Sequence, residues 1–323
     1  MSFRAVRIAA LAAASISLLA ACGSSATTTG AAAVSASGAS SSYPTQDVVS
    51  GVAEDATLHA ALLATDPGAA SGLSLGTTYQ PGQTGLPHAG QSAAGAKSGA
   101  DVDDIGADVD LRNAVAKVLG TTWNVQNGTF ATIIPGVQNG KYDVGQDNFG
   151  VTAAREKIVN FATYLTDGQA LLAPSDSSLN SVTNITQLCG LTIGTGAGTT
   201  FQTILQTNAS KCAAAGKKAY TVDYFSDNSA IWLGLANGRI DAYFGPTLSL
   251  KYDATHVANV KFLSQISSTP VGFVTTKGSG LAALLSEAVN KLIANGSYAK
   301  ILAKWSIDGY GVSSSRVNPA ATL

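Results

Sequence analysis

Short apolar runs alternate with segments of helical character along most of the chain. The apolar runs have the length of buried strands and lie at 73–76, 142–145 and 191–194. Segments that read as helices lie at 109–119, 129–137 and 201–207. The first of these has apolar residues at helical spacing and stops at Gly120, a typical C-terminal cap. The alternation of strands and helices predicts an α/β fold.

One turn sequence occurs twice. Residues 138–144 read Gln-Asn-Gly-Lys-Tyr-Asp-Val, and residues 236–242 read Ala-Asn-Gly-Arg-Ile-Asp-Ala. Each copy fits a helix end, an Asn-Gly turn, a basic residue and then a strand that carries an aspartate. The two copies predict two lobes of similar build with a cleft between them. A coincidence of turn chemistry is the alternative.

The N-terminus has the features of an export signal. Arg4 and Arg7 precede an apolar stretch at 8–21, which is too short to span a bilayer comfortably. The stretch ends in Leu-Ala-Ala-Cys-Gly at 19–23, which resembles the lipobox of bacterial lipoproteins. We therefore expect residues 1–21 to be a lipoprotein signal peptide and Cys22 to be the lipidated N-terminus. An ordinary secretory signal with an incidental cysteine is the alternative.

The segment that follows has no periodic pattern. Residues 22–45 consist mainly of Ser, Ala, Thr and Gly, so we expect a flexible tether. No later run reaches transmembrane length without charge. We expect the folded body to work outside the cytoplasm, anchored to the cell membrane through its lipid.

Composition and charge narrow the class of protein. A chain of 323 residues favours two domains or lobes, and a hydrophobic content of 46% allows a large core. The formal net charge is −1, and the Lys and Arg residues form no basic stripe. We therefore expect no nucleic-acid partner.

Two cysteines remain in the body of the chain, Cys189 and Cys212. An exported compartment permits disulfides, and an even count favours their pairing. No C-x-x-C motif or nearby histidine completes a metal site, and neither G-x-S-x-G nor H-E-x-x-H occurs. We expect no metal, no cofactor and no catalytic residues.

Two segments have the character of anion-binding positions. Arg155 lies near the start of an expected helix that opens at Thr152, where the helix dipole disfavours a cation unless an anion joins it. The alternative is a surface ion pair with Glu156 or with a neighbouring residue of the lobe. The second segment is Gly198-Thr199-Thr200, which opens the expected helix at 201–207. Ordinary N-capping by the threonines is the alternative there.

These segments belong to a wider resemblance. The stretches at 105–120, 130–136, 143–161, 188–200, 238–242 and 288–305 resemble the family 3 extracellular solute-binding proteins, the amino-acid receptors of ABC importers. The resemblance implies a two-lobed periplasmic-binding-protein fold of type II that closes on its ligand about a hinge. It places lobe one at 46–166 plus 272–323 and lobe two at 169–268, with crossovers near Gly168 and Pro270.

The resemblance also implies roles for individual residues. Arg155 would bind the α-carboxylate of the ligand, assisted by Asn148 and the Gly150 N–H group. Gly198, Thr199 and Thr200 would contact the ligand from lobe two.

Aromatic residues and acids complete the expected site. Tyr79 and Phe130 match positions where the family stacks aromatic rings on the ligand, although plain core packing is the alternative for Phe130. Pro246 stands where amino-acid receptors carry the acid that pairs with the ligand's ammonium group. Asp147 is the candidate that could supply this charge instead.

The resulting function is that of an extracytoplasmic receptor, not an enzyme. We expect a monomer that binds a small carboxylate-bearing solute, an amino acid or a related compound, and delivers it to the permease subunits of an ABC importer. A dehydratase-like enzyme on the same fold, with Asp147 as its general acid, is one alternative. A structural or sensory lipoprotein is the other.

Overall fold

The computed structural model of the chain describes residues 44–78, 91–92, 104–226 and 228–323. Cys22, Tyr79 and most of the expected tether lie outside these residues.

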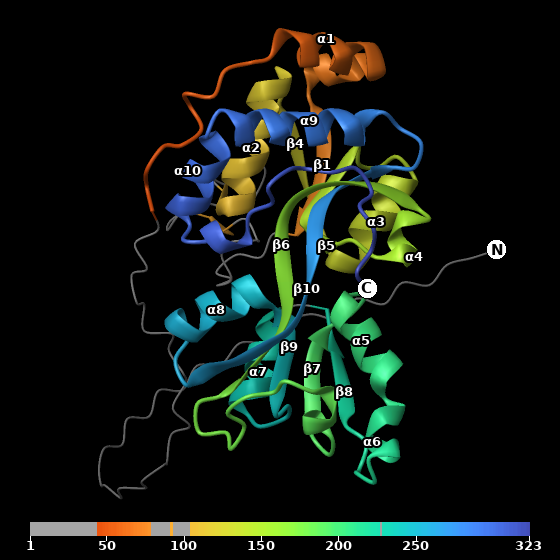
Figure 1. Cartoon of the computed structure of the whole chain (residues 1–323), viewed down its shortest axis with the longest axis vertical. Coiled ribbons are helices and arrows are strands. Elements are labelled where there is room, and N and C mark those ends of the chain that lie inside the picture. The colour runs from red at the N-terminus through yellow and green to blue at the C-terminus, as the bar shows by residue number, and fades with distance from the viewer. Residues whose placement is uncertain (1–43, 79–90, 93–103, 227) are drawn as a thin grey trace, which may run out of the picture. The chain divides into compact units, whose positions relative to one another are not determined.

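One mixed sheet of eight strands runs through the described residues, in the order β4-β1-β5-β10-β6-β9-β7-β8 (Figure 1). Its strands are β1 (Leu73–Thr78), β4 (Trp123–Gly128), β5 (Val144–Gly150), β6 (Val159–Pro174), β7 (Thr192–Gly196), β8 (Thr221–Phe225), β9 (Ala242–Pro246) and β10 (Val260–Thr276). A separate two-stranded sheet pairs β2 (Gln91–Ser92) with β3 (Asp104–Ile105).

Helices cover both faces of the large sheet (Figure 1). They are α1 (Ala56–Thr65), α2 (Ala107–Leu119), α3 (Phe130–Gln138), α4 (Ala153–Glu156), α5 (Thr200–Asn208), α6 (Ser210–Ala214), α7 (Asn228–Ala236), α8 (Thr247–His256), α9 (Leu281–Ala294) and α10 (Ser297–Lys304). Short 3₁₀ turns lie at η1 (Pro67–Ser71), η2 (Ile185–Leu188) and η3 (Asp308–Tyr310). This alternation confirms the predicted α/β class.

Two long strands divide the sheet into halves. β6 has 16 residues and β10 has 17, and they pair antiparallel from Val159 opposite Thr276 to Pro174 opposite Val260. β5 pairs with β10, which places β4, β1 and β5 in what we call the first half. β9 pairs with β6, which places β9, β7 and β8 in the second half.

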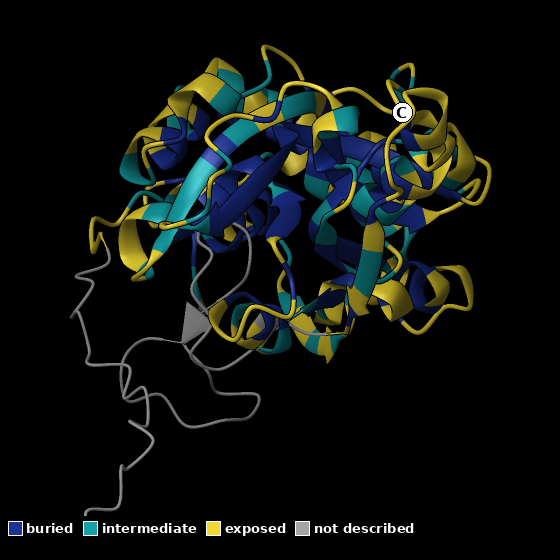
Figure 2. Ribbon diagram, turned by 90° about the horizontal axis from the view of Figure 1, so that it is seen from below, coloured by how far each residue is buried: buried dark blue, intermediate teal, exposed yellow. Residues whose placement is uncertain are grey.

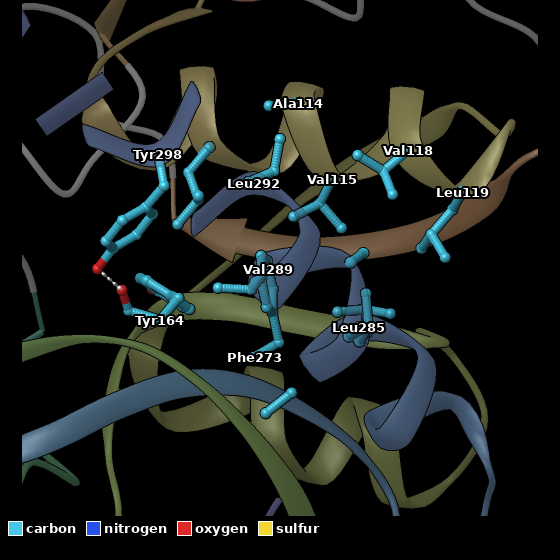
Figure 3. Packing of buried hydrophobic residues seen from close by; sticks show 14 of the residues in the cluster. Ala114, Val115, Val118, Leu119, Tyr164, Phe273, Leu285, Val289, Leu292 and Tyr298 are labelled. Atoms are coloured by element: carbon cyan, nitrogen blue, oxygen red, sulfur yellow. Dashed lines mark hydrogen bonds between the residues drawn. The ribbon is translucent and has the colours of Figure 1, made fainter. Parts of the chain in front are cut away.

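Each half has its own hydrophobic core on both faces of the sheet. In the largest cluster, Val115 and Val118 of α2 pack with Val289 and Leu292 of α9 (Figure 3). A second cluster lies beneath α3, and two further clusters fill the faces of the second half. Figure 2 shows the result, with buried residues concentrated in the strands and exposed residues on the outer sides of the helices.

The repeated turn sequence adopts the same structure in both halves. The backbone N–H of Lys141 donates to the carbonyl oxygen of Gly136 at 2.8 Å, and that of Arg239 donates to Gly234 at 2.9 Å. Gly140 and Gly238, which precede the basic residues, have φ angles of 76° and 72°. Such angles favour glycine, which explains the glycine in both copies.

The aspartates of the two copies also have the same role. Asp143 accepts a hydrogen bond from the backbone N–H of Ser74 at 2.8 Å, which fastens β5 to the neighbouring parallel strand β1. Asp241 accepts from the N–H of Thr192 at 2.7 Å and fastens β9 to β7 in the same way. Coincidence does not explain two complete copies, so the repeat is structural.

Most of the expected elements are present, and one boundary was wrong. α2 ends at Gly120, which has a left-handed φ of 63°, and Thr129 precedes α3 as its N-cap. The strand expected at 142–145 instead runs from Val144 to Gly150. Gly150 pairs with Val271 of β10 and is the last residue of this strand.

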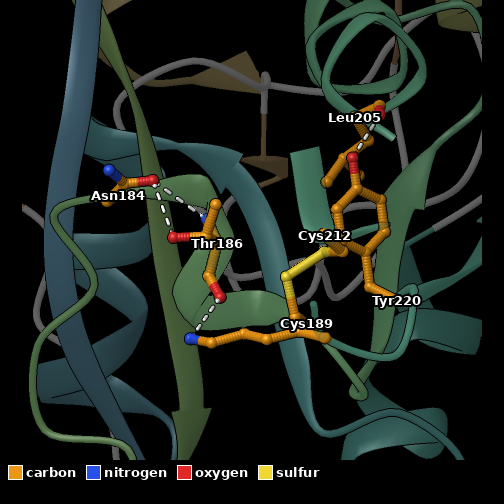
Figure 4. The surroundings of a disulfide bond; sticks show 7 residues. Asn184, Thr186, Cys189, Leu205, Cys212 and Tyr220 are labelled. Atoms are coloured by element: carbon orange, nitrogen blue, oxygen red, sulfur yellow. Dashed lines mark hydrogen bonds between the residues drawn. A yellow bond between two sulfur atoms is a disulfide. The ribbon is translucent and has the colours of Figure 1, made fainter. Parts of the chain in front are cut away.

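The predicted disulfide is present in the second half of the sheet. Cys189, directly after η2, bonds to Cys212 of α6, with their Cα atoms 5.6 Å apart (Figure 4). Cys212 is fully buried in a cluster that includes Leu188 and Leu205. The bond therefore ties α6 to the segment that leads into β7.

Replacing both cysteines in the Cys189→Ala/Cys212→Ala variant should lower the free energy of unfolding by about 3 kcal/mol. The bond closes a loop with a sequence separation of 23 residues, and its loss restores conformational freedom to the unfolded chain. Urea unfolding under oxidising conditions measures the difference. With reductant present, wild type and variant should converge. Equal midpoints without reductant would contradict the prediction.

Candidate ligand-binding site

A cavity of about 200 Å³ lies where the two halves of the sheet meet. Its volume suits a small solute, since pockets for drug-sized ligands are larger, about 300–1,000 Å³. Its lining residues come from both halves and from the central strands. They include Thr78, Phe130, Asp147, Asn148, Gly150, Arg155, Asp167, Gln169, Thr199, Thr200, Phe225, Tyr243, Pro246, Ser249 and Thr269.

Arg155 reaches the cavity from α4, a helix of four residues. Thr152 is its N-cap and accepts a hydrogen bond from the backbone N–H of Arg155 at 3.1 Å. The helix begins where the sequence predicted, but a single turn has little macrodipole. The prediction that the helix dipole opposes Arg155 was therefore wrong, and the position of the side chain has another cause.

Two carbonyl groups hold the guanidinium of Arg155. Nη1 donates to the oxygen of Gly150 at the end of β5 at 3.0 Å, and Nη2 donates to the oxygen of Gly198 at 3.2 Å. Gly150 belongs to the first half of the sheet, whereas Gly198 lies just before α5 in the second. No carboxylate of the described residues lies within ion-pair distance of Arg155, so the alternative pair with Glu156 is not formed there.

Two aromatic rings pack against the guanidinium of Arg155. The guanidinium carbon of Arg155 lies 5.4 Å from the ring centre of Phe130 and 5.7 Å from that of Phe149. The two rings pack together with centres 4.8 Å apart. Burial lowers the pKa of Arg155 to about 10, so the side chain remains cationic at neutral pH. Phe130 thus contributes both to core packing and to the support of the cation.

β5 is irregular where it passes the cavity. Gly272 of β10 pairs with Phe149, and Val274 pairs with Gly145. Between these two pairs β10 has one residue, whereas β5 has residues 146–148, which therefore form a β-bulge. Asn148 has a left-handed φ of 54°, which asparagine tolerates better than most residues. Neighbouring side chains of a regular strand point to opposite faces. The bulge explains why Asp147 and Asn148, which are adjacent, both line the cavity.

The acids near the bulge are tied to neighbouring elements. Asp147 accepts a hydrogen bond from the hydroxyl of Thr78 in β1 at 2.8 Å. The side-chain amide of Asn148 donates to Oδ2 of Asp167 in β6 at 2.7 Å. Asp147 is 7% exposed and Asp167 is 2% exposed, so both carboxylates are shielded from bulk water.

Asp167 also caps a helix of the second half. Pro246 is the N-cap of α8 and has no side-chain acceptor for the free N–H groups of the first turn. Oδ1 of Asp167 accepts from the backbone N–H of Leu248 at 3.1 Å and from that of Gly168 at 2.7 Å. One carboxylate therefore connects β5, through Asn148, to the start of α8.

The second half contributes a helix start. Thr199 is the N-cap of α5: its hydroxyl accepts from the N–H of Gln202 at 3.2 Å and donates to the oxygen of Gly196 at 2.7 Å. Gly198 has a φ of 75°, which glycine adopts readily. Thr200 lines the cavity with 9% of its surface exposed. The N-capping alternative therefore applies to Thr199, whereas Thr200 is the first residue of the helix.

Most of the site residues expected from the sequence come together. Seven line the cavity: Phe130, Asp147, Asn148, Gly150, Arg155, Thr199 and Thr200. Gly198 joins them through its bond to Arg155. The sequence reasoning missed Thr78, Asp167, Gln169, Phe225, Tyr243, Ser249 and Thr269 as lining residues. Asp167 carried a usable signal, since it is the one charged residue of β6 and lies at the expected crossover.

The described residues contain no group of three or more His, Cys, Asp or Glu side chains that could hold a metal ion. The arrangement offers a cation on aromatic rings, two carboxylates and several amide and hydroxyl groups. Such groups bind a small polar solute through charge-assisted hydrogen bonds. No helix in the described part of the chain combines the length and the apolar character that a membrane span requires.

Two halves on a pair of shared strands, with a solute-sized cavity between them, define a two-lobed binding protein. The chain belongs to the bacterial extracellular solute-binding proteins, family 3, which match it over residues 98–308. This membership confirms the predicted family and its two-lobed α/β fold.

Two relatives of the chain are arginine-binding proteins. The arginine-binding periplasmic protein of Mannheimia haemolytica is 29% identical over 209 residues, which cover 62% of this chain and 81% of that protein. ABC transporter arginine-binding protein 1 of Escherichia coli is 28% identical over 215 residues, covering 64% and 84%. A solved structure of an ancestral arginine-binding protein bound to arginine is 28% identical, with a TM-score of 0.62 over 72% of this chain and 97% of that one.

The Asp167→Ala variant should lower the free energy of unfolding by about 1–3 kcal/mol. The change leaves the N–H of Leu248 and the amide of Asn148 buried without their acceptor. Denaturant unfolding measures the loss, with Asp176→Ala on an exposed loop as the matched control. A variant of Asp167 as stable as this control would show that the cap is unimportant.

Proposed function

We propose that the protein is the extracytoplasmic receptor of an ABC importer. It binds a small carboxylate-bearing solute, an amino acid or a related compound, between its lobes and delivers it to the permease subunits. It acts as a monomer held at the cell membrane by a lipid on Cys22.

The geometry of Arg155 is the observation that carries this proposal. Its guanidinium lies at a solute-sized cavity, remains cationic at neutral pH and has no carboxylate partner among the described residues. A guanidinium has more N–H donors than the bonds to Gly150 and Gly198 use. The remaining donors suit a carboxylate, which a guanidinium binds through parallel hydrogen bonds.

Solute transfer also requires a conformational change. We place lobe one at 46–166 plus 272–323 and lobe two at 169–268, so that the chain passes between them in β6 and β10. Rotation about these strands near Gly168 and Pro270 closes the lobes on a solute that contacts both. The bonds of Arg155 to carbonyl groups of both halves support this arrangement.

The Arg155→Ala variant should lose about 2–5 kcal/mol of affinity for the solute, as a buried charge pair does when one partner is removed. Arg155→Lys should recover part of it, because an ammonium group lacks the planar pair of donors. Calorimetry with a panel of standard L-amino acids, beginning with the arginine bound by relatives of the chain, makes the measurement.

Arg316→Ala is the matched control for this series. Arg316 is exposed and contributes hydrogen bonds to Thr163 through its backbone. Its replacement should leave the affinity unchanged. Undiminished binding by Arg155→Ala would exclude Arg155 as the carboxylate-binding residue.

Lipidation of Cys22 gives a separate prediction. Wild type expressed in a bacterium should partition into the detergent phase, and Cys22→Ser into the aqueous phase, because the variant lacks the acyl chains. The Cys189→Ala/Cys212→Ala variant should still enter the detergent phase. Equal partitioning of wild type and Cys22→Ser would rule out the anchor.

A further inference from the structure

The helix α8 packs against the hydrophobic cores of both halves. It follows β9 of the second half directly. Leu250 is fully buried in a cluster of the second half that also contains residues of α7. Leu248, two residues earlier, lies instead in the largest cluster, together with Leu165 and Ile307 of the first half. A rotation of one half against the other therefore has to change the contacts of α8.

A side-chain contact outside the cavity joins the same helix to the first half. Nζ of Lys251 in α8 donates a hydrogen bond to the hydroxyl oxygen of Tyr310 in η3 at 2.6 Å. Tyr310 packs against the largest cluster, and the next residue, Gly311, pairs with Leu165 of β6. Neither Lys251 nor Tyr310 lines the cavity. The contact thus connects the halves without being part of the solute site.

Two aromatic rings, one from each half, lie close to the ammonium group of Lys251. Its nitrogen is 5.3 Å from the ring centre of Tyr310 and 5.7 Å from that of Phe262. Phe262 pairs with Leu172 of β6 and packs against the same cluster as Leu250. The faces of such rings attract a cation. The lysine is therefore carried and supported by the second half, and its hydrogen-bond acceptor comes from the first.

The contact of Lys251 with Tyr310 depends on how the halves are arranged, because its two residues lie on different halves. It is present together with the bonds of Arg155 to carbonyl groups of both halves, at the cavity itself. An interaction made in one arrangement and lost in another shifts the equilibrium between them. The affinity for a solute follows the fraction of molecules in the binding arrangement.

We propose that Lys251 and Tyr310 form a latch between the lobes, which stabilises the solute-binding arrangement from outside the cavity. Lys251 supplies the cation, Tyr310 the acceptor and one ring, and Phe262 the second ring. This inference rests on the proposed closure of two lobes and adds a device to it: the affinity for the solute depends on residues that do not line its cavity.

Conservative variants of the two residues test the latch. Tyr310→Phe removes the acceptor and keeps the ring, and Lys251→Met removes the cation and keeps most of the side chain. Calorimetry with the standard L-amino acids identifies the best solute of wild type, and each variant should bind it about 3–5-fold more weakly, as expected for an exposed contact of a cation. The double variant should bind no more weakly than Lys251→Met alone, because the two residues act as a pair.

Lys261→Met is the matched control for the lysine. Nζ of Lys261 donates to the carbonyl oxygen of Ser177 at 2.7 Å, a contact within the second half. Its replacement removes a lysine hydrogen bond that does not depend on the arrangement of the lobes. The affinity for the solute should therefore stay unchanged in this variant.

Small-angle scattering of solute-free wild type and of the double variant provides a measurement that needs no solute. The expected loss of affinity, or a larger radius of gyration in the double variant, supports the latch. An unchanged affinity together with an unchanged radius overturns it, and so do losses that add up in the double variant. If no amino acid binds wild type, the proposed function fails, and the radius of gyration alone decides whether the latch exists.

Discussion

The backbone ladder between β6 and β10 carries both halves of the sheet, but each half is attached to a different strand of the pair. β5 bonds to β10, and β9 bonds to β6. The two strands must therefore approach closely along their whole length. At Gly272 a Cβ atom would lie 2.6 Å from the carbonyl oxygen of Ala162 in β6, so the ladder tolerates no side chain there. Because both halves of the sheet are attached to this one pair of strands, residues of both halves line the same cavity.

The repeat places chemically different side chains at equivalent positions on the two sides of the cavity. Asp143 and Asp241 fasten equivalent strands, β5 and β9, and the fifth residue after each is Asn148 and Pro246. Both of these residues line the cavity. The same backbone plan thus presents an amide from one half and an apolar ring from the other. The two halves share a backbone plan but differ in these side chains, so one side of the site is more polar than the other.

Local sequence signals predicted the parts of the fold that local chemistry controls. The cap at Gly120, the two Asn-Gly turns and the disulfide follow from residues close to one another in the chain or from a simple cysteine count. The bulge in β5 does not, because it depends on the register with β10, far away in the sequence. Asp167 escaped prediction for the same reason: its partners Asn148 and Leu248 become neighbours only in the folded chain.

Within the first half, Arg155 is held at the cavity by its bond to Gly150 and by the rings of Phe130 and Phe149. Fixing a free arginine side chain costs up to about 2 kcal/mol in rotamer entropy. Here that ordering takes place when the protein folds rather than when the solute arrives. Less of the solute's interaction energy is then spent on ordering the receptor, so weak contacts from a small molecule suffice for useful affinity.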